Sequence, residues 1–120
     1  MATKVLVVED ERAAREGVQQ FLQYVGFDVR AEADADHAVS AAGDWPPDVL
    51  VCDWQLDGPK DGVDVATAIQ LSCGCPVIFI TAHPIEYLRR QSGALNVRRY
   101  LHKPFPLQEL AAAVTAAAAS

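Results

Sequence analysis

Short apolar runs alternate with longer amphipathic stretches along the chain. The runs at 5–8, 49–52 and 77–80 are continuously apolar and rich in β-branched residues, as expected for parallel strands that are covered on both faces. A run at 27–31 alternates apolar and polar side chains, and a run at 97–101 has two arginines in its middle. These two strands are therefore predicted to lie nearer the edges of a sheet.

The stretches between the runs have the spacing of amphipathic helices. The apolar stripe of the first consists of Ala14, Val18, Phe21, Leu22 and Val25. Gly26 follows, where the end of a helix requires a positive φ. The stripe of the last consists of Leu107, Leu110, Ala111, Val114 and Ala118. Shorter helices are predicted around 35–43, 63–72 and 84–92, with Pro84 in the first turn of the third.

Five strand–helix units account for the whole chain of 120 residues, a length typical of one domain. Each connection is long enough for a right-handed crossover between parallel strands. The sequence therefore predicts a single α/β domain over 1–120, an open, doubly wound parallel sheet with helices on both faces. The alanine-rich segment 111–120 is interpreted as the last helix fraying out.

Composition excludes several classes of protein. Hydrophobic residues make up 51% of the chain and charged residues 22%, which argues against disorder. No apolar run approaches the roughly 20 residues of a membrane span, and the start is too acidic and short for a signal peptide. We therefore expect a soluble, cytoplasmic domain without a membrane. The net charge of −6 argues against a nucleic-acid-binding surface over the whole domain, so no direct nucleic-acid partner is expected.

The net charge changes sign along the chain, from −9 over residues 1–64 to +3 over residues 65–120. Four of the ten basic residues are Arg89, Arg90, Arg98 and Arg99. They are interpreted either as part of a solvated surface with scattered charge or as a basic face for a partner. The three cysteines, Cys52, Cys73 and Cys75, fit neither a disulfide set nor a zinc site and are interpreted as reduced structural thiols.

Charged and hydroxyl residues follow four of the predicted strands. Glu9 and Asp10 follow the first strand, and Asp53 ends the third. Thr81 follows the fourth strand and Lys103 the fifth. Ligands bind such sheets beyond the carboxyl ends of the strands. If the first strand lies between the second and the third, the three acids converge, and Thr81 and Lys103 flank them.

This combination of side chains suits phosphoryl transfer. Three close carboxylates repel one another unless a cation such as Mg²⁺ neutralises them. A lysine and a hydroxyl at the same point add donors for an anion. No glycine-rich nucleotide loop is present, so the phosphoryl group is expected from another donor. Taken singly, Asp10 or Thr81 could serve merely as a helix cap, and Lys103 could be a surface lysine. Their joint position at the strand ends favours a phosphoryl-transfer site.

The ordered motifs VLVVEDE, VLVCDWQL, DGVDVA, FITA and RRYLHKPF resemble the receiver domain of two-component response regulators over essentially the whole chain. The resemblance implies a (βα)5 flavodoxin-like fold with strand order 2-1-3-4-5. It also implies that Asp53 accepts a phosphoryl group from a histidine kinase or a phosphotransfer protein. Glu9, Asp10, Asp53 and the backbone carbonyl of Gln55 would hold Mg²⁺, and Lys103 would neutralise the phosphoryl oxygens.

The resemblance further implies a conformational switch. Thr81 would move toward the phosphoryl group and Tyr100 would turn inward, repacking the face of the fourth helix, fifth strand and fifth helix. The bond before Pro104 is expected to be cis. Gln55 and His83 occupy two positions that tune the phosphoryl lifetime in this family. The loop 53–62 is one residue longer than is usual in the family. Its conformation is therefore not predicted, but the chemistry expected of the site is unchanged.

Three functions are compared on these residues. The first is a phosphorylated receiver that acts on a downstream partner or dimerises, alone or within a larger regulator or hybrid kinase, and that catalyses only its own phosphorylation and dephosphorylation. The second is a pseudo-receiver that binds a partner without phosphorylation, which intact Asp53, Thr81 and Lys103 argue against. The third is a metal-dependent hydrolase, which would need a carboxylate where Gln55 stands.

Overall fold

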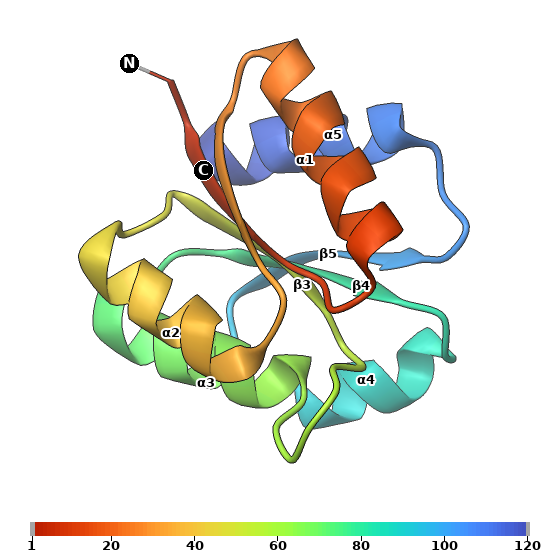
Figure 1. The fold of residues 1–120 in the computed structure, drawn as a ribbon. Helices are drawn as coiled ribbons and strands as arrows, with labels where there is room; N and C mark the ends of the chain where they lie inside the picture. The colour runs from red at the N-terminus through yellow and green to blue at the C-terminus, as the bar shows by residue number, and fades with distance from the viewer. Residues whose placement is uncertain (1, 120) are drawn as a thin grey trace.

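The computed structural model describes residues 2–119, in which strands and helices alternate (Figure 1). The strands are β1 (Lys4–Val8), β2 (Asp28–Glu32), β3 (Val49–Asp53), β4 (Val77–Thr81) and β5 (Val97–His102). The helices are α1 (Arg12–Val25), α2 (Ala35–Asp44), α3 (Gly62–Cys73), α4 (Ile85–Gln91) and α5 (Leu107–Ala119). The strands form one parallel sheet of order β2-β1-β3-β4-β5, which confirms the expected α/β, flavodoxin-like architecture.

Burial of the strands follows their place in the sheet. Every residue of β3 and β4 is buried, whereas β2 and β5 each contain exposed positions among buried or half-buried ones. A strand covered by helices on both faces requires continuous apolar side chains, and an edge strand does not. The two runs predicted to lie at the edges do form the edges.

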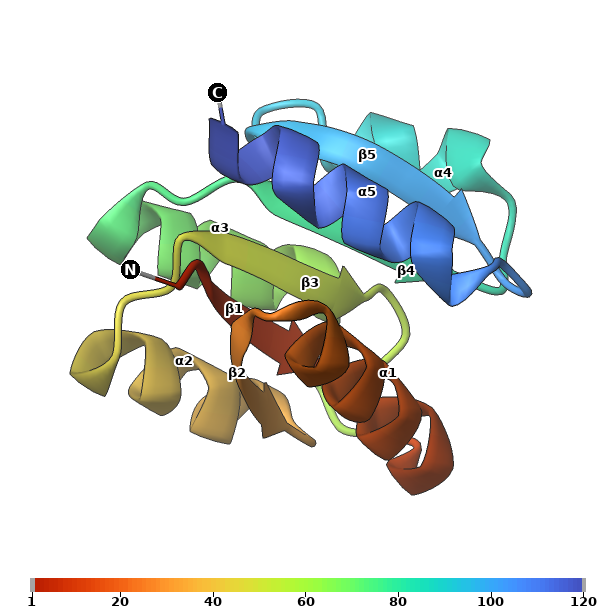
Figure 2. The same ribbon diagram turned by 90° about the horizontal axis from the view of Figure 1, so that it is seen from above.

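Helices α1 and α5 cover one face of the sheet, and α2, α3 and α4 cover the other (Figures 1 and 2). Successive strand residues point to opposite faces, so each strand contributes to two apolar clusters. The cluster under α1 and α5 includes Val7, Val51, Ile80, Leu22 and Leu110. The opposite cluster includes Leu6, Phe79, Ala38, Ile69 and Leu88. The sheet is thereby fixed between two packed layers.

The acid that caps the N-terminus of α1 is Glu11 and not Asp10. The side chain of Glu11, not that of Asp10, accepts the backbone N–H of Ala14 at the start of the helix. Gly26 closes the helix with φ 118°, as predicted. Capping therefore uses Glu11 and leaves the carboxylate of Asp10 available at the end of β1.

The helix stripes differ in detail from the prediction. Val25 is 47% exposed, and Ala117 rather than Ala118 is buried in α5. Both differences lie at helix ends, where a 3.6-residue period carries the apolar stripe off the sheet. Helix α5 continues to Ala119 instead of fraying over 111–119, and Pro84 is the residue before α4; Ser120 lies outside the described residues. Within 2–119, every helix is too short or too polar to cross a bilayer.

Candidate functional site

The three predicted acids meet at the carboxyl end of the sheet. β1 and β3 are hydrogen-bonded neighbours, so Glu9 and Asp10, which follow β1, lie beside Asp53, the last residue of β3. One carboxylate oxygen from each of the three lies within 4.8 Å of the others. Glu9 and Asp53 are buried, and Asp10 is half-buried. The predicted convergence of the acids is confirmed.

Lys103 reaches this cluster from the end of β5. Its Nζ donates hydrogen bonds to Asp53 Oδ2 at 2.7 Å and to Glu9 Oε1 at 2.8 Å. Its backbone N–H donates to the carbonyl of Thr81 at 2.8 Å, which joins the ends of β5 and β4. The peptide bond between Lys103 and Pro104 is cis, as the resemblance implies. Lys103 is therefore not a free surface lysine.

The charges of the cluster are only partly compensated. Burial raises the pKa of Glu9 to about 7; the hydrogen bond from Lys103 opposes this shift, and Asp53 adds to it. Partial burial lowers the pKa of Lys103, but its hydrogen bonds to Asp53 and Glu9 outweigh that effect, and the pKa lies above its ordinary value. The one ammonium of Lys103 thus contacts two of the three carboxyl groups, which leaves the cluster in need of further positive charge.

The donor set fits a hard divalent cation. Carboxylate oxygens are the ligands that Mg²⁺ prefers, and it usually binds one or two carboxylates together with waters and phosphate oxygens. Glu9, Asp10 and Asp53 form a candidate metal site of this kind. Cysteine and histidine contribute nothing to it, so softer transition metals are disfavoured.

The loop after β3 closes against the same acids. The backbone N–H of Gln55 donates to Asp53 Oδ1 at 3.2 Å, and that of Asp57 donates to Asp10 Oδ2 at 2.9 Å. On the other side, Arg15 Nη1 donates to the backbone carbonyls of Glu9 and Asp10, at 3.0 and 3.2 Å. These bonds hold the acids in place. They also bring the backbone of Gln55 to the cluster.

Gly62 permits the close approach of this loop to β3. Its N–H donates to the carbonyl of Trp54 at 2.7 Å. A Cβ at this position would lie 2.1 Å from the carbonyl oxygen of Asp53, a distance that no side chain tolerates. The glycine in the DGVDVA motif is therefore explained by packing against the residue that carries the central carboxylate.

Thr81 ends β4 and is fully buried, but its hydroxyl is engaged within its own turn. Thr81 Oγ1 accepts the backbone N–H of His83 at 2.8 Å and donates to the carbonyl of His83 at 3.3 Å. The hydroxyl thus bonds backbone groups of the local turn at the end of β4. The sequence had predicted its position at the site but not this partner.

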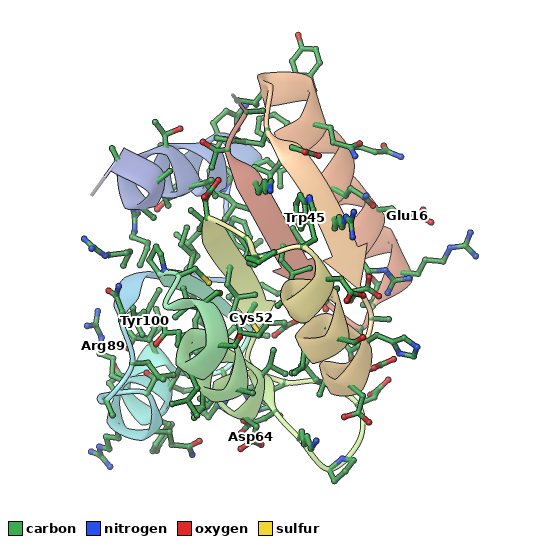
Figure 3. All side chains as sticks on the ribbon, turned by 90° about the vertical axis from the view of Figure 1, so that its left-hand side faces the viewer. Glu16, Trp45, Cys52, Asp64, Arg89 and Tyr100 are labelled. Atoms are coloured by element: carbon green, nitrogen blue, oxygen red, sulfur yellow. The ribbon has the colours of Figure 1, made fainter. Side chains whose placement is uncertain are left out.

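Tyr100 is half-buried on the α4 side of β5. Its ring stacks on Phe79 with a centroid separation of 6.1 Å, and its hydroxyl lies 2.7 Å from the buried Ser92 Oγ. The guanidinium of Arg89 lies 4.6 Å from the ring centre, and Figure 3 shows the two residues together beside α4. Sequence reasoning missed Ser92, because a serine at the end of a short helix gives no signal of such a bond.

The four arginines come from two elements and differ in their partners. Arg89 and Arg90 lie on α4, whereas Arg98 is an extra residue in β5 at a break in its pairing with β4. Arg99 forms an ion pair with Glu109 of α5, so its charge is already compensated. The remaining three arginines are exposed.

Comparison with known proteins agrees with this arrangement. Residues 5–115 match the response regulator receiver domain family. The chain is 31% identical to the signal receiver domain of a modulated diguanylate cyclase from Desulfovibrio desulfuricans G20, with a TM-score of 0.90 and coverage of 99% of this chain and 95% of that one. It is 30% identical to the N-terminal domain of a response regulator/sensory box/GGDEF protein from Carboxydothermus hydrogenoformans, with a TM-score of 0.89 and coverage of 98% and 94%.

The fold is also that of the chemotaxis protein CheY4 from Vibrio cholerae, with a TM-score of 0.90 at 23% identity and coverage of 98% and 99%. The match of the family to nearly the whole chain, the strand order and the acidic cluster agree with one another. This chain therefore belongs to the response regulator receiver domain family.

Proposed function

We propose that the chain is a phosphorylation-dependent signalling switch in which Asp53 is the phosphoacceptor. The observation that carries this proposal is the position of Asp53: it is buried at the end of β3, with Glu9 and Asp10 within metal-binding distance and Lys103 Nζ 2.7 Å away. A carboxylate held between a candidate cation site and an ammonium is arranged to receive a dianionic group.

In the proposed reaction, one oxygen of Asp53 attacks the phosphorus of a phosphohistidine. The P–O bond forms as the P–N bond breaks, and the electron pair of that bond remains on the imidazole nitrogen. When bound, Mg²⁺ would neutralise charge on the phosphoryl oxygens; Asp10, Asp53 and the carbonyl of Gln55 would hold it, and Glu9 would contribute through water. The ammonium of Lys103, already at the site, would bind a phosphoryl oxygen.

The proposed switch uses Thr81 and Tyr100. At rest the hydroxyl of Thr81 donates to the carbonyl of His83, and that of Tyr100 is bonded to Ser92. A phosphoryl group on Asp53 offers Thr81 a charged acceptor, which stabilises only the arrangement in which the hydroxyl has turned toward it. Release of the β4–α4 turn would then allow Tyr100 to move and the surface of α4, β5 and α5 to repack.

We propose two kinds of partner. The phosphoryl donor is a histidine kinase or a phosphotransfer protein, which fits the family. The output is a downstream protein or a second copy of the chain, bound through the face of α4, β5 and α5. The exposed Arg89, Arg90 and Arg98 give this face positive charge, so an acidic partner fits best. Relatives in proteins with further domains also fit a receiver that belongs to a larger regulator.

Charge reversal tests the output face. The double variant Arg90→Glu and Arg98→Glu should abolish association of the chain with an acidic partner or with a second copy, because it replaces attraction by repulsion on this face. Arg12→Glu is the matched control, since Arg12 is exposed on α1. Association that survives the double variant would exclude the arginines from the interface.

His83 and Gln55 are proposed to tune the lifetime of the phosphoryl group. His83 lies in the turn that Thr81 contacts, and Gln55 is bonded through its N–H to Asp53. His83→Ala should therefore change the decay rate of phosphorylated protein. A decay rate equal to that of the wild type would remove His83 from this role.

The main experiment is intact-mass spectrometry after incubation with Mg²⁺ and acetyl phosphate. The wild type should gain one phosphoryl group, and EDTA should prevent the gain. Asp53→Asn should gain nothing, whereas Asp57→Asn, a matched change in the exposed loop, should behave as the wild type. No gain by a wild type that binds Mg²⁺ in a titration would favour the alternative, a pseudo-receiver that binds a partner without phosphorylation.

A further inference from the structure

The turn between β4 and α4 uses the proton of the Thr81 hydroxyl. Thr81 Oγ1 donates to the carbonyl of His83 at 3.3 Å while it accepts the N–H of the same residue at 2.8 Å. A hydroxyl carries a single proton. Thr81 therefore cannot donate to a group on Asp53 until it leaves the His83 carbonyl, so whatever holds His83 in place also holds Thr81.

Trp54 is a fixed neighbour of this turn. It directly follows Asp53, its N–H donates to the carbonyl of Ile80 at 2.9 Å, and its carbonyl accepts the N–H of Gly62 at 2.7 Å. Its side chain is 6% exposed. Both the backbone and the ring of Trp54 are therefore held by the end of the sheet.

The rings of Trp54 and His83 meet edge to face. Their centroids lie 6.1 Å apart and their planes are at 85°, a favourable arrangement for two aromatic rings. His83 itself is exposed. The indole is thus the fixed surface against which an otherwise exposed imidazole is placed.

The indole is held by packing and not by a polar bond. Its Nε1–H is buried and has no hydrogen-bond partner among residues 2–119. An unpaired buried donor is unfavourable, so a hydrogen bond cannot explain why a tryptophan stands here. The contact with His83 gives the large ring a role that a smaller apolar residue could not fill.

We propose that Trp54 is a positioning residue that acts through His83. The contact between the two rings holds the β4–α4 turn closed on the Thr81 hydroxyl, so the pair opposes the rotation of Thr81 toward Asp53 and sets how readily the switch occurs. This inference rests on the proposed function, in which Thr81 must turn toward a phosphoryl group on Asp53. Loss of either ring should favour the open turn by about three- to tenfold, the range expected for one aromatic pair.

Hydrogen exchange of the backbone amide at position 83 tests the contact without any phosphorylation, because this N–H is bonded to Thr81. After correction for intrinsic rates, His83→Ala should raise the exchange rate about three- to tenfold, and His83→Phe, which restores a ring, should return it toward the wild-type value. Trp54→Leu should match His83→Ala, and the double variant should add nothing further.

Trp45→Leu is the control, because Trp45 packs against Lys4 and Arg30 instead, and it should leave this amide unchanged. If Trp54→Leu does not fold, the two His83 variants decide alone, since that side chain is exposed. Exchange within about twofold of the wild type in His83→Ala would overturn the proposal.

Phosphorylation rates then connect the contact to the switch. With acetyl phosphate and Mg²⁺, Trp54→Leu and His83→Ala should each be phosphorylated about three- to tenfold faster than the wild type, and not additively. If the variants were phosphorylated at the wild-type rate although the amide at position 83 exchanged faster, the proposed effect of the ring contact on Thr81 would be overturned. A wild type that takes up no phosphoryl group would instead refute the proposed function, while the amide measurement would still report on the contact.

Discussion

Lys103 Nζ lies 2.7 Å from Asp53 Oδ2 and at the same time 2.8 Å from Glu9 Oε1. Both carboxylates are buried, with side chains 7% exposed, whereas the lysine side chain is 32% exposed. One ammonium therefore stabilises two carboxylates that would otherwise repel each other. Because Glu9 follows β1, Asp53 ends β3 and Lys103 follows β5, these two bonds also connect the ends of three strands.

Removal of this ammonium should destabilise the protein in a pH-dependent way. In EDTA at pH 8, Lys103→Met should lower the free energy of unfolding by about 2–4 kcal/mol, because two buried carboxylates lose their cation. The loss should be smaller at pH 6, where Glu9 takes up a proton. Lys60→Met, which removes the exposed ion pair with Asp36, should cost less than about 1 kcal/mol. Urea unfolding measures both, and equal losses at the two pH values would contradict the account.

Glu9 should make the metal-free protein less stable as the pH rises. Its pKa is about 7 in the fold against an ordinary value of 4.5, so between these values the folded state binds more protons than the unfolded state. Stability in EDTA should therefore fall by about 1–2 kcal/mol from pH 4.5 to 7 and then level off. Glu9→Gln should abolish this part of the pH dependence. For the same reason, Mg²⁺ should bind more weakly below pH 7, which calorimetry can measure; binding independent of pH would exclude Glu9 as the titrating group.

Two glycines should respond in opposite directions to alanine. Gly62→Ala places a Cβ 2.1 Å from the Asp53 carbonyl, so it should lower stability by about 2–4 kcal/mol and weaken Mg²⁺ binding. Gly17→Ala in helix α1 meets nothing within 4 Å and should raise stability by about 0.5–1 kcal/mol. Thermal or urea unfolding measures the stability of both variants. A Gly62→Ala variant as stable as the wild type would mean that the loop after β3 does not pack against Asp53 as described.

The three cysteines should differ sharply in reactivity. Cys52 is fully buried, and burial raises its pKa well above the ordinary value; burial and the neighbouring Cys73 raise the pKa of Cys75 to about 12. Cys73 is only half-buried. A maleimide should therefore label Cys73 first, Cys75 slowly and Cys52 only on unfolding, as peptide mass spectrometry would show. Early labelling of Cys52 would contradict the packing of β3.

The alternation of apolar runs was sufficient to predict the sheet and its edge strands. The acids at the strand ends predicted the convergence of Glu9, Asp10 and Asp53 only once the first strand was placed between the second and the third. Those features depend on local pattern and on the rule that parallel strands end at one edge. The strand order came from the resemblance, because periodicity does not determine which strands pair.

Features that depend on exact registration could not be predicted. The division of the arginines follows from one extra residue in β5, Arg98, and from the ion pair between Arg99 and Glu109. A one-residue shift changes the face to which a side chain points. Likewise, the contact of Trp54 with His83 joins residues from two different strand ends, and neither residue alone indicates the other.

The central claim is that Asp53 carries the phosphoryl group, and its most direct test locates that group. After incubation with Mg²⁺ and acetyl phosphate, borohydride reduces an acyl phosphate to an alcohol and so marks the modified aspartate in the peptide mass spectrum. We predict that position 53, and not Asp10 or Asp57, is recovered as homoserine. Reduction at another carboxylate, or at none while the Mg²⁺ site is filled, would contradict the account.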